Sequence, residues 1–266
     1  MDTRPIALFD SGSGGLSIWK SIVSLLPLES TVYMGDHRYI PYSTKNVEFI
    51  QRRGKCAIQF LISRKAKIIV VACNTATVAG IDYFRKIFPD IPIVGVVPVI
   101  KTAAKMSQKK KFGVLSTERT AKSDYQKKLI RTFASDCEVY PVGNTQLVSL
   151  IENGEKDSVR VVELLEKLLN PLCKKDVDVL VLGCTHFPFL RTQIQKIIGK
   201  SVLILDSGDA VAMQVKRILE HENLLSDNQK PTHQFFTTGN PAKVRDVISR
   251  LLERGIVVKT VPDSVQ

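Results

Sequence analysis

The chain has 266 residues, of which 44% are hydrophobic, enough to build one large α/β domain or two of modest size. It contains no run of about 18 apolar residues, so no transmembrane helix is expected. Its first residues lead directly into a short strand-like run and show no signal-peptide core, which predicts a cytoplasmic protein.

The net charge is +12, from 38 basic and 26 acidic residues, a balance that can attract nucleic acid or an acidic metabolite. The basic residues are scattered, with short clusters at Lys109–Lys111 and Lys127–Lys128. No basic stretch is interleaved with aromatic residues, and no zinc-finger spacing occurs. We therefore favour a solvated basic surface over a nucleic-acid interface.

Short apolar runs rich in valine and isoleucine alternate with stretches of helical period along the chain. The runs predict strands at Ile6–Phe9, Thr31–Met34, Ile68–Ala72, Ile93–Val97, Phe112–Leu115, Val177–Leu182 and Val202–Leu205. The stretches predict helices at Val47–Ser63, Ala121–Phe133, Val159–Leu169 and Ala210–Glu222, among others. Apolarity is continuous along the strands, which is typical of a parallel sheet covered on both faces. The alternation indicates an α/β fold.

The chain also reads as two similar halves, opened by Ile6–Ser11 and by Phe112–Thr117. We therefore predict two three-layer α/β/α domains with mostly parallel sheets, related by a pseudo-two-fold axis, with the active site in the cleft between them. The first domain is expected to comprise residues 1–97 and 208–266, and the second residues 98–207. The hinge is expected near Val97-Pro98, where a strand ends in proline.

The segments at residues 69–75 and 180–186 have similar sequence patterns, and each carries a cysteine after an apolar run. Cys73 and Cys184 are both expected at the carboxyl end of a strand, near a helix N-terminus that stabilises thiolate. Asn74 and Thr75 are good N-cap residue types, so Cys73 taken alone could equally be a packing residue beside a cap. Two thiols in equivalent places suggest two catalytic groups that move a proton on either face of one carbon. His186 is expected to assist Cys184 or to hold a carboxylate.

Other roles for these cysteines fit less well. A thiol hydrolase with a cysteine–histidine pair would leave Cys73 without a role, and neither thiol has a second ligand at metal-binding spacing. The remaining cysteines, Cys56, Cys137 and Cys173, are predicted to be small buried hydrophobic residues. All five are expected to be free thiols in a reducing compartment.

Two polar turns follow the first two predicted strands. Asp10–Gly15 is rich in glycine but lacks the spacing of a P-loop or a dinucleotide fingerprint. Such a turn lets backbone N–H groups approach a carboxylate or a phosphate, although a simple turn remains an alternative. Asp10 is better suited to an ammonium group or a proton-transfer partner. After the second strand, Pro41–Ser43 can offer backbone donors and a hydroxyl.

These motifs together resemble those of bacterial glutamate racemases, in the aspartate/glutamate racemase superfamily, over essentially the whole chain. The matching segments are Phe9–Leu16, Gly35-Asp36 with Pro41-Tyr42, Val71–Ala76, Pro92–Pro98, Thr117 with Thr120, Leu182–Pro188, Asp206–Gly208 and Thr238–Pro241. The resemblance implies racemisation of glutamate by two bases, with no cofactor and no metal, to supply D-glutamate for peptidoglycan. It also implies a homodimer.

The resemblance assigns roles residue by residue. Cys73 and Cys184 become the two acid/base groups, acting on D-glutamate and L-glutamate respectively. Asp10, Glu152 and His186 match positions that tune or assist the thiols, and Asp10 and His186 also match substrate contacts. The other substrate-binding positions are Ser11, Tyr42, Ser43, Asn74, Thr75, Thr185, Thr117 and Thr120.

The sequence departs from the family pattern at two positions. Ser43 stands where the family usually has glycine, and Arg119 replaces a commonly small residue; both bear on substrate affinity rather than on the reaction class. An aspartate racemase remains an alternative within the superfamily. A nucleic-acid-binding or regulatory protein on the same fold is motivated by the charge and opposed by the intact pair of thiols.

Overall fold

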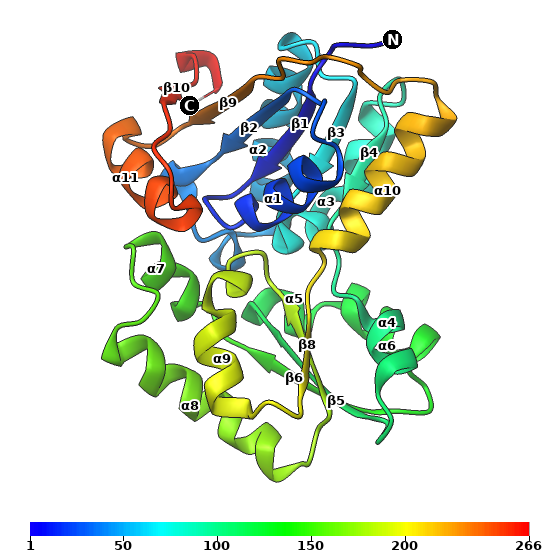
Figure 1. The fold of residues 1–266 in the computed structure, drawn as a ribbon, viewed down its shortest axis with the longest axis vertical. Coiled ribbons are helices and arrows are strands. Elements are labelled where there is room, and N and C mark those ends of the chain that lie inside the picture. The colour runs from blue at the N-terminus through cyan, green and yellow to red at the C-terminus, as the bar shows by residue number, and fades with distance from the viewer. Residues whose placement is uncertain (266) are drawn as a thin grey trace. The chain divides into compact units, whose positions relative to one another are not determined.

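The computed structural model describes residues 1–265, and the chain divides into two compact units (Figure 1). One unit consists of Met1–Val96 with Gly208–Gln266, and the other of Val97–Ser207. Each unit contains one sheet in which every paired strand is parallel, with helices along the connections. The predicted α/β class is therefore confirmed. The pseudo-two-fold axis and the cleft between the units stay predictions.

The first unit is built on a six-stranded sheet in the order β10-β9-β2-β1-β3-β4. Its strands are β1 (Ile6–Asp10), β2 (Thr31–Gly35), β3 (Ile68–Val71), β4 (Ile93–Gly95), β9 (His233–Thr237) and β10 (Val258–Thr260). Its helices are α1 (Leu16–Leu25), α2 (Val47–Ser63), α3 (Asn74–Ile87), α10 (Gly208–His221) and α11 (Pro241–Leu252), with the 3₁₀ turns η1 (His37–Tyr39), η2 (Tyr42–Thr44) and η4 (Asp263–Val265). Helix α1 packs on α10, and α2 packs on α3.

Burial on both faces explains the continuous apolarity of the central strands. Phe9 and Val71 belong to the apolar cluster that α2 and α3 cover, whereas their neighbours along the strands point to the opposite face. All residues of β1, β2 and β3 are buried. A strand with both faces covered favours apolar side chains at every position, so the sequence is a nearly uninterrupted apolar run, and the polar Asp10 and Thr31 lie at strand ends.

The second unit has a four-stranded sheet in the order β6-β5-β7-β8. Its strands are β5 (Lys111–Ser116), β6 (Glu138–Gly143), β7 (Val179–Gly183) and β8 (Leu203–Leu205). Its helices are α4 (Ile100–Met106), α5 (Glu118–Lys122), α6 (Asp124–Phe133), α7 (Gln146–Glu152), α8 (Val159–Lys174) and α9 (Arg191–Ile198), with the 3₁₀ turn η3 (Phe187–Leu190).

The two sheets repeat one strand order. The spatial order β2-β1-β3-β4 in the first unit matches the order β6-β5-β7-β8 in the second, when the strands of each unit are numbered along the chain. Cys73 follows β3, and Cys184 follows β7, which is the third strand in each set. In the first unit β1 connects to β2 on one side of the sheet and β3 connects to β4 on the other, and β5–β6 and β7–β8 repeat this pattern in the second unit. Each cysteine therefore lies beside a topological switch point. Open α/β sheets bind ligands at such points.

Several predicted elements were wrong in detail. The helix expected over Ala121–Phe133 is split into α5 and α6, because Ser123 is extended and its hydroxyl accepts the N–H of Gln126. Strands β6, β9 and β10 were not predicted. Strand β6 carries Pro141 and is an edge strand with no fully buried residue, so it lacks the apolar signature of the central strands.

The three cysteines outside the repeated motif are not buried as predicted. Cys173 is exposed, and Cys56 and Cys137 are half-buried. The buried stripe of α8 runs through Leu165, Leu169 and Leu172, so the next position along the helix turns away from the core. None of the helices within residues 1–265 has the length and apolarity needed to cross a bilayer.

Candidate active site

The first candidate half-site is centred on Cys73, at the junction of β3 and α3. Cys73 is itself the N-cap of α3: its sulfur accepts the N–H of Ala76 at 3.4 Å. Asn74 and Thr75, although good N-cap residue types, do not cap the helix, since both lie inside its first turn. The sulfur therefore lies at the positive end of a 14-residue helix, which favours a thiolate.

Ser11 lies against Cys73 from the neighbouring strand end. The thiol contacts the Ser11 hydroxyl, with 3.5 Å between Sγ and Oγ. Strands β1 and β3 are paired in register, and this pairing brings together two residues that are 62 positions apart. Cys73 is only 6% exposed, so the thiol and the hydroxyl meet in a nearly dry environment.

The glycine-rich turn after β1 is held by hydrogen bonds at Gly12. The carboxylate of Asp10, which is fully buried, accepts the N–H of Gly12 at 2.7 Å, and Tyr33 donates its hydroxyl to the Gly12 carbonyl. A side chain at Gly15 would lie 2.8 Å from the Cβ of Ala72, so glycine is required for the close approach. The Gly12 N–H, one of the backbone donors expected to approach a ligand, is thus already bonded to Asp10.

The side chains of Asn74, Thr75 and Tyr42 are also buried. Asn74 donates its amide to the Val96 carbonyl, which ties the start of α3 to the end of β4. The Tyr42 hydroxyl donates to Asp36 at 2.6 Å, so its proton is used within the protein, and a substrate contact of Tyr42 stays a prediction. Burial, together with the charge of Asp36, raises the pKa of Tyr42, so the phenol remains a donor. What the turn presents is the backbone around Tyr42 and the half-buried Ser43.

The second candidate half-site is a hydrogen-bonded chain of Cys184, His186 and Glu152. Nδ1 of His186 lies 3.8 Å from Sγ of Cys184, and Nε2 lies 2.7 Å from Oε1 of Glu152. The cysteine and the histidine follow β7, whereas the glutamate is the last residue of α7. The structure therefore joins Glu152, the least conspicuous of the predicted residues, to the most conspicuous pair.

This chain keeps His186 positively charged. Burial lowers the pKa of His186, but the hydrogen bonds to Cys184 and Glu152, and the charges of these two groups, outweigh it and raise the pKa well above the ordinary value of 6.5. The imidazolium places a positive charge beside the Cys184 sulfur, at 3.8 Å. The second sulfur thus lies beside a cation, whereas the first lies at a helix N-terminus.

The three remaining threonines are buried in the second unit. Thr117 caps α5 by accepting the N–H of Thr120, and it donates its hydroxyl to that of Thr120 at 3.0 Å. Thr120 is fully buried, while Thr117 and Thr185 are 5% and 4% exposed. Thr117 follows β5 just as Ser11 follows β1, and β5 pairs with β7, which precedes Cys184.

Sequence reasoning missed the buried group around Asp36. Arg53, Tyr42 and Thr238 all bond to this carboxylate. The available signal was the resemblance itself, which included Gly35-Asp36 and Thr238–Pro241 without giving them a role. The short basic clusters also have partners: Lys109 pairs with Asp176 and Lys127 with Asp124.

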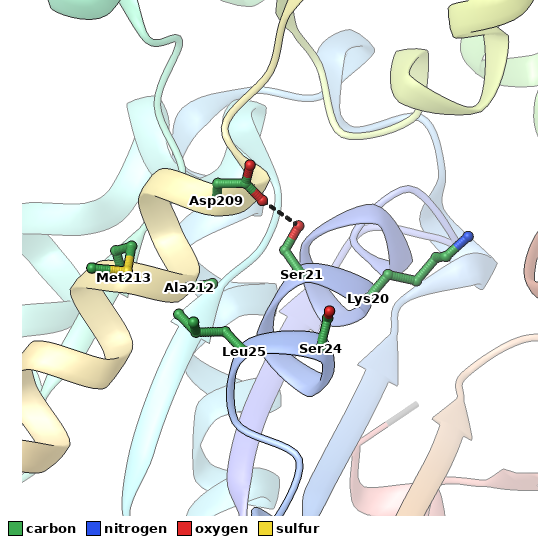
Figure 2. Close-up of a pocket in the computed structure, with 7 residues that line it drawn as sticks. All are labelled: Lys20, Ser21, Ser24, Leu25, Asp209, Ala212 and Met213. Carbon is green, nitrogen blue, oxygen red and sulfur yellow. Dashed lines mark hydrogen bonds between the residues drawn. The ribbon is translucent and has the colours of Figure 1, made fainter.

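A pocket of about 540 Å³ in the first unit lies between α1 and α10 and involves none of the predicted site residues (Figure 2). Ser21 and Asp209 point toward one another across it, with 3.4 Å between their oxygens. Leu25, Ala212 and Met213 line its apolar part. Its helices do not carry either cysteine, so we do not include it in the active site.

Comparison with known proteins agrees with the geometry. Residues 13–215 match the family described as Asp/Glu/Hydantoin racemase. A glutamate racemase from Pseudomonas paraeruginosa is 37% identical over 247 residues, which cover 93% of each chain. One from Cupriavidus pinatubonensis is 37% identical over 98% of this chain and 96% of its own.

Solved structures show the same fold. A glutamate racemase isoform from Bacillus anthracis has a TM-score of 0.90 at 34% identity and covers both chains completely. The Escherichia coli glutamate racemase, solved with L-glutamate and an activator, has a TM-score of 0.86 at 32% identity over 97% of this chain and 98% of its own. An aspartate racemase from Picrophilus torridus is 19% identical, with a TM-score of 0.56, over 83% of this chain and 99% of its own, so it shows the fold alone. From the matched residues and from these relatives, the chain belongs to the Asp/Glu/Hydantoin racemase family.

Proposed function

We propose that this protein interconverts L- and D-glutamate by a two-base mechanism that uses Cys73 and Cys184 and no cofactor. The observation that carries the proposal is the pair of buried thiols that follow equivalent strands, one at a helix N-terminus beside Ser11 and the other beside His186. The relatives named as glutamate racemases match over nearly the whole chain, so the substrate class extends to it.

The reaction is a proton transfer across one carbon. The Cys73 thiolate removes the α-proton of D-glutamate, and the electron pair left on the carbon is delocalised into the adjacent carboxylate. The Cys184 thiol then delivers its proton to the opposite face, which gives L-glutamate and the Cys184 thiolate. In the reverse direction the roles are exchanged. Two thiols of similar acidity suit a reaction that must run both ways.

The two faces are expected to lie across a cleft between the units, with the first domain ending near residue 97 and resuming at 208. An α-proton next to a carboxylate is weakly acidic, so the base requires a dry, preorganised site. The burial of both thiols supports this requirement. Asp10 and the His186–Glu152 pair are proposed to tune the two thiols.

Substrate binding is proposed to use short polar groups around both thiols. In the first unit these are Ser11, the first turn of α3 at Asn74 and Thr75, and the backbone at Tyr42-Ser43. In the second unit they are Thr185 and His186, with Thr117 and Thr120 behind them. Ser43 in place of glycine adds a side chain to this turn, so we expect it to narrow the pocket rather than abolish binding.

The biological role follows from the product. We propose that the enzyme works in the bacterial cytoplasm and supplies D-glutamate for peptidoglycan, in the form of a homodimer. Free cysteines that must remain thiols support a reducing compartment. Sedimentation or light scattering of the purified protein tests the dimer.

The decisive experiment follows racemisation and isotope exchange together. Purified protein is incubated with L-glutamate in D₂O without added cofactor, and the products are followed by optical rotation and by α-deuterium incorporation. We expect D-glutamate carrying deuterium at the α-carbon. Neither exchange nor D-glutamate would rule out the proposal, and turnover of L-aspartate alone would favour an aspartate racemase.

A further inference from the structure

The carboxylate of Asp36 is the centre of a fully buried network that joins four segments of the first unit. Arg53 binds both of its oxygens, with Nε to Oδ2 and Nη2 to Oδ1 both at 2.8 Å. Tyr42 donates its hydroxyl to Oδ2 at 2.6 Å, and Thr238 donates to Oδ1 at 2.8 Å. Asp36 is 0% exposed, and its own N–H donates to the carbonyl of Asp10.

Arg53 reaches beyond this carboxylate to the end of the chain. Its Nη2 also donates to the carbonyl of Val265 at 2.7 Å, and its guanidinium lies 4.5 Å from the ring centroid of Tyr39. One side chain on α2 thus contacts both the segment from Asp36 to Tyr42 and the C-terminal turn η4. Burial opposes the charge of Arg53, but the bonds to Asp36 outweigh it and raise its pKa, so the side chain stays a cation.

We propose that Arg53 is a positioning residue that fixes the substrate-binding turn at Tyr42-Ser43 and that the C-terminal turn η4 forms part of this support. The proposal rests on the proposed function, in which the backbone of that turn takes part in substrate binding. Arg53 itself does not touch the substrate. It acts through Asp36, which holds the Tyr42 side chain and thereby the backbone on either side of it.

The geometry requires arginine rather than any cation. The planar guanidinium supplies parallel N–H donors that match the two carboxylate oxygens, and it has a further N–H for Val265. A lysine is a point charge and cannot hold all three acceptors in this arrangement. Without the paired N–H donors of the guanidinium, the buried carboxylate of Asp36 is left incompletely paired. The segment from Asp36 to Tyr42 must then shift to bring this carboxylate nearer to water.

The test compares Arg53→Lys with Arg52→Lys. Arg52 is the neighbouring residue on the same helix; it is exposed, and its guanidinium stacks on Phe49 instead. We expect Arg53→Lys to raise KM for both enantiomers by about tenfold or more while kcat falls less, since the thiols are untouched. Arg52→Lys should retain the wild-type KM. Wild-type protein that does not racemise glutamate would instead overturn the proposed function.

Two further measurements separate positioning from simple stability. Thr238→Val removes one hydroxyl from Asp36, and a chain ending at Pro262 removes the Val265 carbonyl; each should raise KM in the same direction as Arg53→Lys. Amide hydrogen exchange should become faster over residues 36–44 in all three variants but not across β3. This exchange readout needs no activity, so it tests the support even if the substrate differs. Lower melting temperatures with unchanged KM and unchanged exchange over residues 36–44 would overturn the inference.

Discussion

Nε2 of His186 lies 2.7 Å from Oε1 of Glu152, and both side chains are almost completely shielded from solvent. The contact turns the histidine into a relay between a carboxylate and the Cys184 sulfur, which lies 3.8 Å from the other ring nitrogen. Against the opposing effect of burial, the hydrogen bonds to Cys184 and Glu152 raise the pKa of His186, so that the ring is charged at neutral pH. The charge on this histidine therefore depends in part on a residue of another element, α7.

We predict that Glu152→Gln lowers activity most strongly at neutral and alkaline pH. A neutral amide still accepts a hydrogen bond but supplies no charge, so the part of the raised pKa of His186 that comes from Glu152 is lost and the pKa falls. A smaller fraction of His186 is then charged at neutral and alkaline pH, and Cys184 loses part of the cation beside it. The pH dependence of kcat with L-glutamate tests this. Identical pH profiles for Glu152→Gln and wild type would contradict the relay.

The same substitution should change how stability depends on pH. In the wild type the native His186 pKa is above the unfolded value, so its contribution to stability is complete below about pH 6.5 and is lost as the pH rises through the native pKa. In Glu152→Gln this loss should be smaller, because only the contribution of Cys184 remains. Urea unfolding between neutral and alkaline pH should therefore show the wild-type advantage shrinking as the pH rises. A constant difference would mean that His186 is not the titrating group.

We predict that Cys73→Ser and Cys184→Ser each lose racemisation in both directions by about 10²–10⁴-fold. Every turnover needs one thiol to accept a proton and the other to donate, and an alcohol is far too weak an acid to exchange these roles. Cys173→Ser, at an exposed position on α8, is the matched control and should retain activity. Near-normal turnover by either active-site variant would exclude the two-thiol mechanism.

Individual residues show which features of the candidate site could be predicted from the sequence. Cys73 and Cys184 were predictable because apolar strands precede them and because the motif occurs twice. The hydrogen-bond partner of Cys73 was harder to predict. It is Ser11, which reaches Cys73 because β1 pairs with β3, and no local sequence pattern encodes the register of that pairing. Glu152 could be assigned only through the resemblance, because α7 brings it to His186 across 34 positions. The Asp36–Arg53 pair had no local signal, since Arg53 lies in a helix rich in basic residues and burial alone distinguishes it from Arg52.

Gln126 offers a test of packing in the second unit. It is 0% exposed, and neither amide atom of its side chain has a hydrogen-bond partner within residues 1–265. Leaving buried polar atoms unpaired costs about 1–3 kcal/mol, so we predict that Gln126→Met raises the free energy of unfolding by about 1 kcal/mol. Gln146→Met, at an exposed helix start, should change it by less than about 0.5 kcal/mol. A clear loss of stability in Gln126→Met would show that the amide is satisfied in solution, and a loss of activity alone would point to ligand contact.

The ion pair of Lys67 and Glu29 is expected to matter for stability and not for catalysis. Nζ lies 2.6 Å from Oε2, the side chains are 0% and 2% exposed, and Nζ also donates to the carbonyls of Asp2 and Leu224. The pair therefore holds the segment at Asp2 and the segment after α10 against the amino ends of the strands, because Lys67 precedes β3 and Glu29 precedes β2, whereas Cys73 follows the carboxyl end of β3.

We predict that Lys67→Met lowers the free energy of unfolding by about 3–5 kcal/mol, because it leaves Glu29 buried without its cation. Adding Glu29→Leu should restore part of the loss, since removing both charges ends the desolvation cost of the carboxylate. The exposed pair of Lys109 and Asp176 is the control, and Lys109→Met should cost less than about 1 kcal/mol. Under conditions where all variants are folded, KM and kcat should match the wild type. If Lys67→Met instead raised KM without lowering stability, the pair would have to act on the site at the carboxyl ends of the strands. That result would contradict the structural role predicted for the pair.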